Sequence, residues 1–178
     1  MIRWLTICNF IAMNETFFYK SPVGILLIKT TDELVTEVTF AETERKNNVA
    51  ASPGQPLNPL TKKCIEQLED YFSGRSLSFD LPLGQQGTEF QQSVWTALLN
   101  IPYGRTVSYL HLSKTLGNVK AIRAVGTANG KNNIVIIVPC HRVIGSNGGL
   151  VGYGGDLWRK QWLLEHEAKY ANGVQTLF

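Results

Sequence analysis

The residue best suited to chemistry in this chain is Cys140, which is followed directly by His141 and Arg142. Five apolar residues, 134–138, and then Pro139 precede it, so the sequence predicts a buried segment that carries a thiol to a bend. A thiol becomes a strong nucleophile only as a thiolate, and neighbouring His or Arg side chains lower its pKa toward that state. We therefore predict an activated cysteine at this position, against the alternative of an inert cysteine at the end of a core segment.

Charge is distributed unevenly along the chain. The 178 residues carry a net charge of only +3, but residues 1–87 hold eight Lys and Arg against ten Asp and Glu, whereas residues 88–178 hold nine against four. No carboxylate occurs between Phe90 and Gly155, although six Lys and Arg lie in that stretch. This bias predicts a surface that faces a polyanion such as nucleic acid.

Cysteine usage and hydropathy indicate the compartment. Cys8, Cys64 and Cys140 are odd in number and far apart, which predicts neither a disulfide framework nor a zinc site. The first 13 residues have too short and interrupted an apolar core for a signal peptide, and Met13 is an alternative start. No segment is long and apolar enough to span a membrane. We expect a cytoplasmic protein that binds no metal.

The first half of the chain alternates like a small antiparallel sheet. Three strands are expected at 15–20, 23–29 and 34–40, followed by a polar loop over 41–57. Asn58 and Pro59 then predict a helix that ends at Ser73-Gly74 and carries Cys64 on its packed stripe. Residues 76–87, rich in Gly and Pro, are expected to link two parts.

The second half is expected to be mainly helical. Thr88 and Gln91 form a capping-box pattern, and the helix that follows should bury the apolar face Phe90, Val94, Ala97, Leu98 and Ile101. A short helix at 108–116, a Gly117-Asn118 turn and a helix at 120–128 predict a helix-turn-helix pair. The second helix should bury Ala121, Ala124, Val125 and Ala128, and should expose Lys120, Arg123 and Thr127.

These elements predict an α+β fold in two parts. Residues 1–84 are expected to form an N-terminal α/β domain with a small antiparallel sheet, one helix and a supporting role. Residues 85–178 are expected to form a C-terminal, mainly helical domain with a winged helix-turn-helix-like motif and the thiol.

Several unlinked motifs agree in order and spacing with one family. They are 90–95 (Phe-Gln-Gln-Ser-Val-Trp), 101–104 (Ile-Pro-Tyr-Gly), 123–126 (Arg-Ala-Val-Gly), 139–145 (Pro-Cys-His-Arg-Val-Ile-Gly) and 158–167, while the first half matches mainly through 21–24. On these residues the chain resembles the O6-alkylguanine-DNA alkyltransferases (methylated-DNA–protein-cysteine methyltransferases). The resemblance implies an irreversible, stoichiometric transfer of an alkyl group from O6 of guanine, and from O4 of thymine, to the protein's own cysteine. No cofactor is implied, and the expected partner is double-stranded DNA bound by a monomer.

The resemblance also assigns the reacting groups. Cys140 would accept the alkyl group, and His141 would act as its base through a water, since adjacent side chains on extended backbone point in opposite directions. Helical spacing leaves Glu165 and Glu167 as alternatives for orienting His141, and only the resemblance selects Glu167. Tyr109 would donate a proton to the leaving guanine and lie near the DNA backbone, although core packing is its alternative role.

Further matches concern DNA and the base. Arg123 would fill the stack after the nucleotide is extruded, on a helix that the family inserts in the minor groove, although the sequence alone suggests the major groove. Asn132 would tie the helix pair together beneath the site, with Asn133 in place of the family's usual proline. The base would be held by the Val143 carbonyl and by the loop residues Tyr153, Gly154 and Gly155, whose two glycines should leave room for bulkier alkyl groups.

Two other classes of protein are compatible with parts of the pattern. A non-catalytic DNA-damage binder or regulator would share the basic helix but would need no thiol. A cysteine hydrolase would use Cys140 and His141 but would not require the acid-free stretch. Arg142 is expected to be a paired structural charge rather than a phosphate contact.

Overall fold

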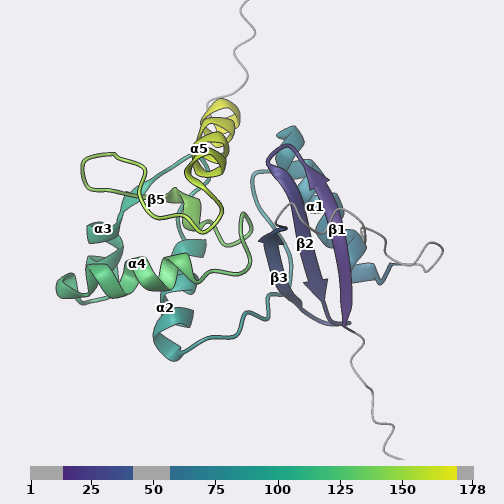
Figure 1. Ribbon diagram of the computed structural model, residues 1–178, viewed down its shortest axis with the longest axis horizontal. Coiled ribbons are helices and arrows are strands. Elements are labelled where there is room, and N and C mark those ends of the chain that lie inside the picture. The colour runs from purple at the N-terminus through teal and green to yellow at the C-terminus, as the bar shows by residue number, and fades with distance from the viewer. Residues whose placement is uncertain (1–13, 42–56, 172–178) are drawn as a thin grey trace, which may run out of the picture.

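The structure, a computed structural model, describes residues 14–41 and 57–171. Two parts lie side by side, a three-stranded sheet with one helix and a mainly helical part (Figure 1), so the predicted α+β class is confirmed. The predicted loop at 41–57 and Cys8 lie almost wholly outside the described residues. The first part consists of β1 (Glu15–Ser21), β2 (Gly24–Thr30), β3 (Val35–Phe40) and α1 (Pro59–Ser73).

The sheet has the order β1-β2-β3 and is antiparallel throughout, which confirms the three predicted strands. The alternation of β2 places Leu26, Ile28 and Thr30 on its buried face. The hydroxyl of Thr30 lies 2.6 Å from the hydroxyl of Thr61 on α1, and this buried hydrogen bond joins sheet and helix. The sheet is therefore closed on one face by α1.

The ends of α1 follow from its sequence. The Asn58 side chain accepts a hydrogen bond from the backbone of Thr61 at 2.7 Å, Pro59 occupies the first turn, and Gly74 ends the helix in the left-handed region. Cys64 is fully buried on this helix, and burial raises its thiol pKa to about 12. The predicted packing role of Cys64 is confirmed.

The second part carries short strands and 3-10 turns among its helices. The Thr88–Gln91 capping box is present at the start of α2. The predicted helix-turn-helix pair is formed by α3 and α4, and β4 and β5 form a parallel pair beside it. The elements are α2 (Glu89–Leu99), β4 (Val107–Ser108), α3 (Tyr109–Thr115), η2 (Val119–Ala121), α4 (Ile122–Gly130), η3 (Cys140–Arg142), β5 (Val143–Ile144) and α5 (Leu157–Ala171).

Two details of the helix prediction are wrong. Phe90 lies in the first turn of α2 and is 40% exposed, whereas the buried face of that helix runs through Val94, Trp95 and Leu98. Ala124 is exposed because the buried face of α4 is centred further along the helix than the predicted one. The buried face of α4 runs instead through Val125, Ala128 and Asn129.

The apolar segment before the cysteine is buried, as predicted, but it is not a strand. Ile134 forms a parallel bridge to Val38 of β3, after which the chain turns back on itself, with Val138 N donating to Ile134 O at 3.0 Å. Ile136 has a φ of 74°, in the left-handed region that apolar β-branched residues rarely adopt. All five side chains are enclosed, which compensates for this local backbone cost.

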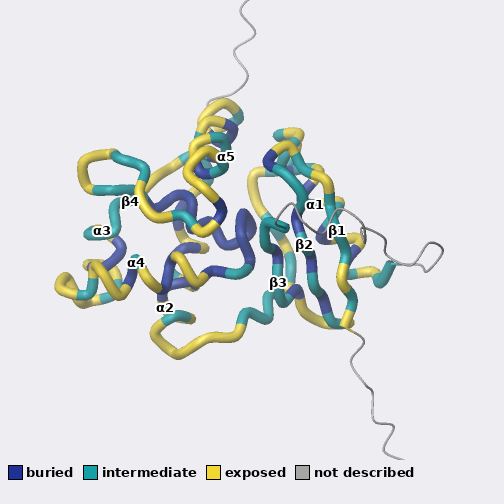
Figure 2. The backbone as a smooth tube through the Cα atoms, viewed as in Figure 1, coloured by how far each residue is buried: buried dark blue, intermediate teal, exposed yellow. Residues whose placement is uncertain are grey.

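The two parts are joined by backbone and side-chain contacts at β3. Val38 donates to Asn133 O and accepts from Val135 N, both at 2.8 Å. The buried residues gather where the helical part faces this strand (Figure 2). At the end of β3 the Phe40 ring lies against Tyr153, with centroids 6.2 Å apart. Within the described ranges, no helix has the length and hydropathy needed to cross a bilayer.

The packing of Phe40 against the loop at Gly155 can be tested by substitution. A Cβ built on the buried Gly155 would collide with the Phe40 ring, whereas at Gly154 the nearest atom is a backbone oxygen at 3.5 Å. We expect Gly155→Ala to lower the free energy of unfolding by about 1–3 kcal/mol, the usual cost of overpacking. Gly154→Ala should stay within about 0.5 kcal/mol of the parent. Urea unfolding measures both, and equal effects at the two glycines would contradict the contact.

Candidate active site

Cys140 begins the short helix η3 directly after Pro139 and is 4% exposed. Its Sγ accepts a hydrogen bond from Nδ2 of Asn132 at 3.1 Å. The same amide donates to Val138 O at 2.8 Å and accepts from Ile134 N at 3.0 Å. The hydrogen bonds of Asn132 therefore shape the turn that carries the thiol, rather than linking α3 to α4 as expected from the sequence.

The environment of the thiol differs from the predicted one. Burial raises the pKa of Cys140, and this effect is opposed by the Asn132 hydrogen bond, the charge of Lys160 and the backbone amides of Cys140 and His141. The His141 and Arg142 side chains do not lower this pKa, because both are turned toward Glu167. The prediction that these two neighbours activate the thiol directly is wrong.

The Glu167 carboxylate is fully buried on α5 and is surrounded by donors. One oxygen receives hydrogen bonds from Tyr71 Oη at 3.0 Å, His141 Nε2 at 2.8 Å and Arg142 Nη2 at 2.9 Å. The other receives Arg142 Nε at 2.9 Å and Gly104 N at 3.0 Å. Burial alone would raise the pKa of Glu167, but hydrogen bonds and charges from His141 and Arg142 hold it at about 2.

This geometry fixes the form of the imidazole. Because the Glu167 carboxylate can only accept, Nε2 of His141 carries the hydrogen, and Nδ1 presents a lone pair. Nδ1 is buried and has no hydrogen-bond partner among the described residues. Burial lowers the pKa of His141, so the ring is neutral at rest and able to accept a proton. Cys140 and His141 lie in a 3-10 turn, which replaces the extended backbone expected there.

Arg142 is a paired structural charge, as predicted. It also donates from Nη1 to Ile101 O at 2.6 Å and lies 5.5 Å from the Tyr103 ring. Glu165, the alternative carboxylate, lies instead in a hydrogen bond with Gln161, 2.8 Å away on the exposed side of α5. The structure therefore places Glu167, and not Glu165, beside His141.

Tyr109 begins α3 and points its hydroxyl at the loop before α5. Its Oη lies 3.3 Å from Val151 O and 3.2 Å from Gly152 O, and it accepts from Asn129 Nδ2 at 3.3 Å. Burial raises the pKa of Tyr109, and the nearby Cys140 raises it further, so the phenol holds its proton. The polar surroundings of the hydroxyl favour a chemical role over simple core packing.

Lys160 is a site residue that sequence reasoning missed. Its ammonium is fully buried and donates to Val143 O at 2.7 Å and to Val151 O at 2.9 Å. Burial lowers its pKa to about 8, while Cys140 acts in the opposite direction. The available signal was its position on α5, three residues before Leu163 on the helix face that also holds Glu167, where a lysine needs a buried partner.

The loop residues predicted to hold the base are placed differently from one another. Tyr153 is partly buried, and its hydroxyl is enclosed without a partner among the described residues. Gly154 is exposed, but Gly155 is buried beneath Phe40. The expectation that both glycines leave room for a bulkier alkyl group is therefore wrong for Gly155, since Phe40 already fills that space.

The predicted DNA-contacting residues share one exposed surface. Lys120, Arg123 and Thr127 are all exposed on η2 and α4. The Thr127 hydroxyl donates to Arg123 O at 3.0 Å, so it is engaged by its own helix. Ile122, between the two basic residues, is also 39% exposed. The helix thus presents two cations and an apolar side chain to a partner.

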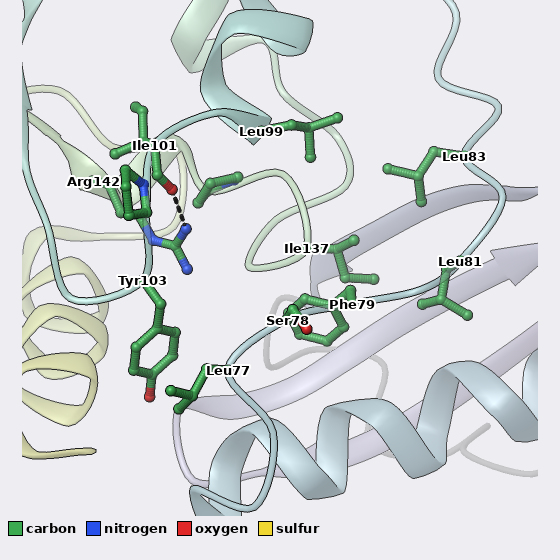
Figure 3. Close-up of a pocket in the computed structure, with 12 residues that line it drawn as sticks. Leu77, Ser78, Phe79, Leu81, Leu83, Leu99, Ile101, Tyr103, Ile137 and Arg142 are labelled. Carbon is green, nitrogen blue, oxygen red and sulfur yellow. Dashed lines mark hydrogen bonds between the residues drawn. The ribbon is translucent and has the colours of Figure 1, made fainter. Parts of the chain in front are cut away.

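Residues 133–142, which carry Cys140, are called the thiol turn below. A separate cavity of about 410 Å³ borders this turn. Arg142 and Ile101 line one side, and Leu81 and Leu83 of the connecting segment line the other (Figure 3). Neither Cys140 nor Tyr109 lines it. This cavity is mainly apolar and lies apart from the thiol and from the Tyr109 hydroxyl.

The thiol environment predicts a pH dependence. Because burial raises the pKa of Cys140, we expect its thiolate absorbance to appear only above the usual thiol range in the free protein. Asn132→Leu removes the hydrogen bond to Sγ that favours the thiolate and should shift the transition to still higher pH. The measurement is the ultraviolet difference spectrum against Cys140→Ser, in which the other thiols cancel. A transition below pH 7 in the parent would contradict the assigned environment.

Both halves of the chain match models of one family. The 6-O-methylguanine DNA methyltransferase DNA-binding domain matches residues 89–169, and the ribonuclease-like domain of the same family matches residues 16–85. A methylated-DNA–protein-cysteine methyltransferase from Methanosarcina acetivorans is 46% identical over 84% of this chain and 95% of its own length. One from Mycolicibacterium paratuberculosis is 43% identical over 93% of this chain and 99% of its own.

Solved structures agree with these relatives. The Mycobacterium tuberculosis O6-methylguanine methyltransferase has 42% identity and a TM-score of 0.77, covering 93% of this chain and 99% of that one. The OGT protein of the same organism in complex with DNA gives the same identity and TM-score over 87% of this chain and 93% of that one. The sequence and the fold thus point the same way, and the chain belongs to the 6-O-methylguanine DNA methyltransferase family as one of its methyltransferases.

Proposed function

We propose that this protein repairs double-stranded DNA by moving a methyl or larger alkyl group from O6 of guanine, and from O4 of thymine, onto Sγ of Cys140. The transfer is irreversible and happens once per molecule, because a thioether is a very poor leaving group. The protein acts as a cytoplasmic monomer and needs no cofactor. The observation that carries the proposal is the single enclosed thiol with Asn132, Lys160 and the His141–Glu167 pair arranged about its turn.

The transfer is a displacement at carbon. The Cys140 thiolate attacks the alkyl carbon in line, the S–C bond forms, and the C–O bond breaks with its electron pair on the guanine oxygen. Tyr109 supplies a proton to the ring nitrogen of the leaving base, which balances the charge that develops there. The raised pKa of Tyr109 keeps that proton available.

The thiolate has to be generated when substrate is present. Nδ1 of His141 accepts the thiol proton through a water, since no direct hydrogen bond joins the two side chains. The resulting imidazolium is stabilised by the Glu167 carboxylate at 2.8 Å. Asn132 and Lys160 stabilise the charge that remains on the sulfur.

Access to the base requires that it leave the duplex, because O6 of a stacked and paired guanine cannot reach an enclosed sulfur. The exposed α4 helix enters the minor groove, and the planar guanidinium of Arg123 occupies the space of the extruded nucleotide. Lys120 and Thr127 contact the DNA backbone beside it. The base then lies against the Val143 carbonyl, Tyr153 and Gly154.

Label transfer tests the reaction. Duplex DNA carrying labelled O6-methylguanine should pass its label to the protein up to one equivalent, and Cys140→Ala should abolish transfer while most DNA binding remains. Cys64→Ala, which removes the other described thiol, should still accept one equivalent. Multiple turnovers would favour a hydrolase, and binding without transfer in the parent would favour a damage binder.

Arg123 should matter most in duplex DNA. We expect Arg123→Ala to slow repair in a duplex at least tenfold more than in a short single strand, because only the duplex leaves a gap to fill. Arg75→Ala, which removes an exposed arginine paired with Asp70 on the other part of the molecule, is the charge-matched control. Single-turnover rates on both substrates give the comparison, and an equal loss on both would exclude the stack-filling role.

A further inference from the structure

Asn129 is a buried polar side chain in the site that the mechanism above does not use. It lies on the inner face of α4 and is 2% exposed. Its Nδ2 donates to the hydroxyl of Tyr109 and to the carbonyl oxygen of Cys140, both at 3.3 Å. Its Oδ1 is enclosed and has no hydrogen-bond partner among the described residues.

The orientation of this amide is fixed by chemistry. The Cys140 carbonyl can only accept a hydrogen bond, so the side-chain atom that faces it must be the nitrogen. Both hydrogens of Nδ2 are then used, one on Cys140 and one on Tyr109. Oδ1 is bonded to the same carbon as Nδ2, so it lies beside the two residues that accept the alkyl group and protonate the leaving base.

A buried carbonyl without a donor is costly, so such a group calls for an explanation, and a donor supplied by the substrate is one. O6-alkylguanine has one hydrogen-bond donor on its base, the 2-amino group, because alkylation at O6 removes the hydrogen from N1. O4-alkylthymine has no donor on its base, since alkylation removes the N3 hydrogen. An acceptor at this place therefore distinguishes the two lesions.

We propose that Asn129 is a specificity-determining residue whose Oδ1 accepts a hydrogen bond from the 2-amino group of the extruded alkylguanine. This inference rests on the proposed function and names what selects its substrate. The second amino hydrogen goes to Val143 O, which keeps a free lone pair beside its hydrogen bond from Lys160. Asn129 thereby joins the reading of the base to the placement of Tyr109, the proton donor.

The test compares two duplexes that differ only in the amino group, one with O6-methylguanine and one with O6-methylhypoxanthine, each opposite cytosine. The measured quantity is the ratio of single-turnover transfer rates. Asn129→Leu should lower this ratio by about five- to tenfold, the value of one hydrogen bond. Asn133→Leu is the matched control, because Asn133 also has a buried, unpartnered Oδ1 within the described chain but bonds to neither Tyr109 nor Cys140. Its ratio should equal that of the parent.

A purely structural role for Asn129 would slow both substrates by the same factor, and an unchanged ratio in Asn129→Leu overturns the inference. If that variant transfers too slowly to measure, affinities of the same two duplexes for Cys140→Ala, with and without Asn129→Leu, give the same ratio from binding. Failure of the parent to take a methyl group from O6-methylguanine would instead reject the proposed function, so the two failures are distinguishable.

Discussion

The buried carboxylate of Glu167 is the constraint on which the arrangement of the site depends. A charge enclosed in this way is tolerated only when donors surround it, and here the donors come from α1, from the segment after α2, and from the thiol turn itself. Removing the carboxylate would leave Arg142 buried and without its ion-pair partner, at a cost of about 3–5 kcal/mol. The carboxylate that orients His141 therefore also links the two parts of the molecule, through its hydrogen bond from Tyr71.

The N-terminal part consequently contributes to the site, although it carries no reacting group. Tyr71 of α1 donates to Glu167, and Gln85 of the connecting segment donates to Asn132 at 3.1 Å. Val38 of β3 holds the thiol turn by two backbone hydrogen bonds, and Phe40 supports the loop at Gly155. The supporting role expected of this part from the sequence corresponds to specific contacts at one strand and one helix.

The sequence was most informative where local rules decide the outcome. Asn58, Pro59 and Gly74 specify the ends of α1, and the capping box specifies the start of α2, because caps depend on a few adjacent residues. Contacts between residues far apart in the sequence could not be predicted by such local rules. The choice of Glu167 over Glu165 depends on which side of α5 meets the thiol turn, and nothing in the spacing reveals it. The apolar run of residues 134–138 predicts burial but not the path of the backbone, because such a run is equally compatible with a strand and with a folded turn.

The pKa of the Cys140 thiol shows most clearly why adjacency in the sequence is a poor guide to the environment of a side chain. Arg142 and His141 stand beside Cys140 in sequence, but their side chains are committed to Glu167, and burial then dominates the titration of the sulfur. A protonated, enclosed thiol reacts slowly with oxidants and small electrophiles, because the thiolate is the reactive form. If Cys140 is consumed by one transfer, as proposed, such protection is useful only when ionisation can follow substrate binding. Three groups allow ionisation at that stage without forcing it beforehand. Asn132 and Lys160 stabilise the thiolate, and the neutral imidazole of His141 can accept the thiol proton.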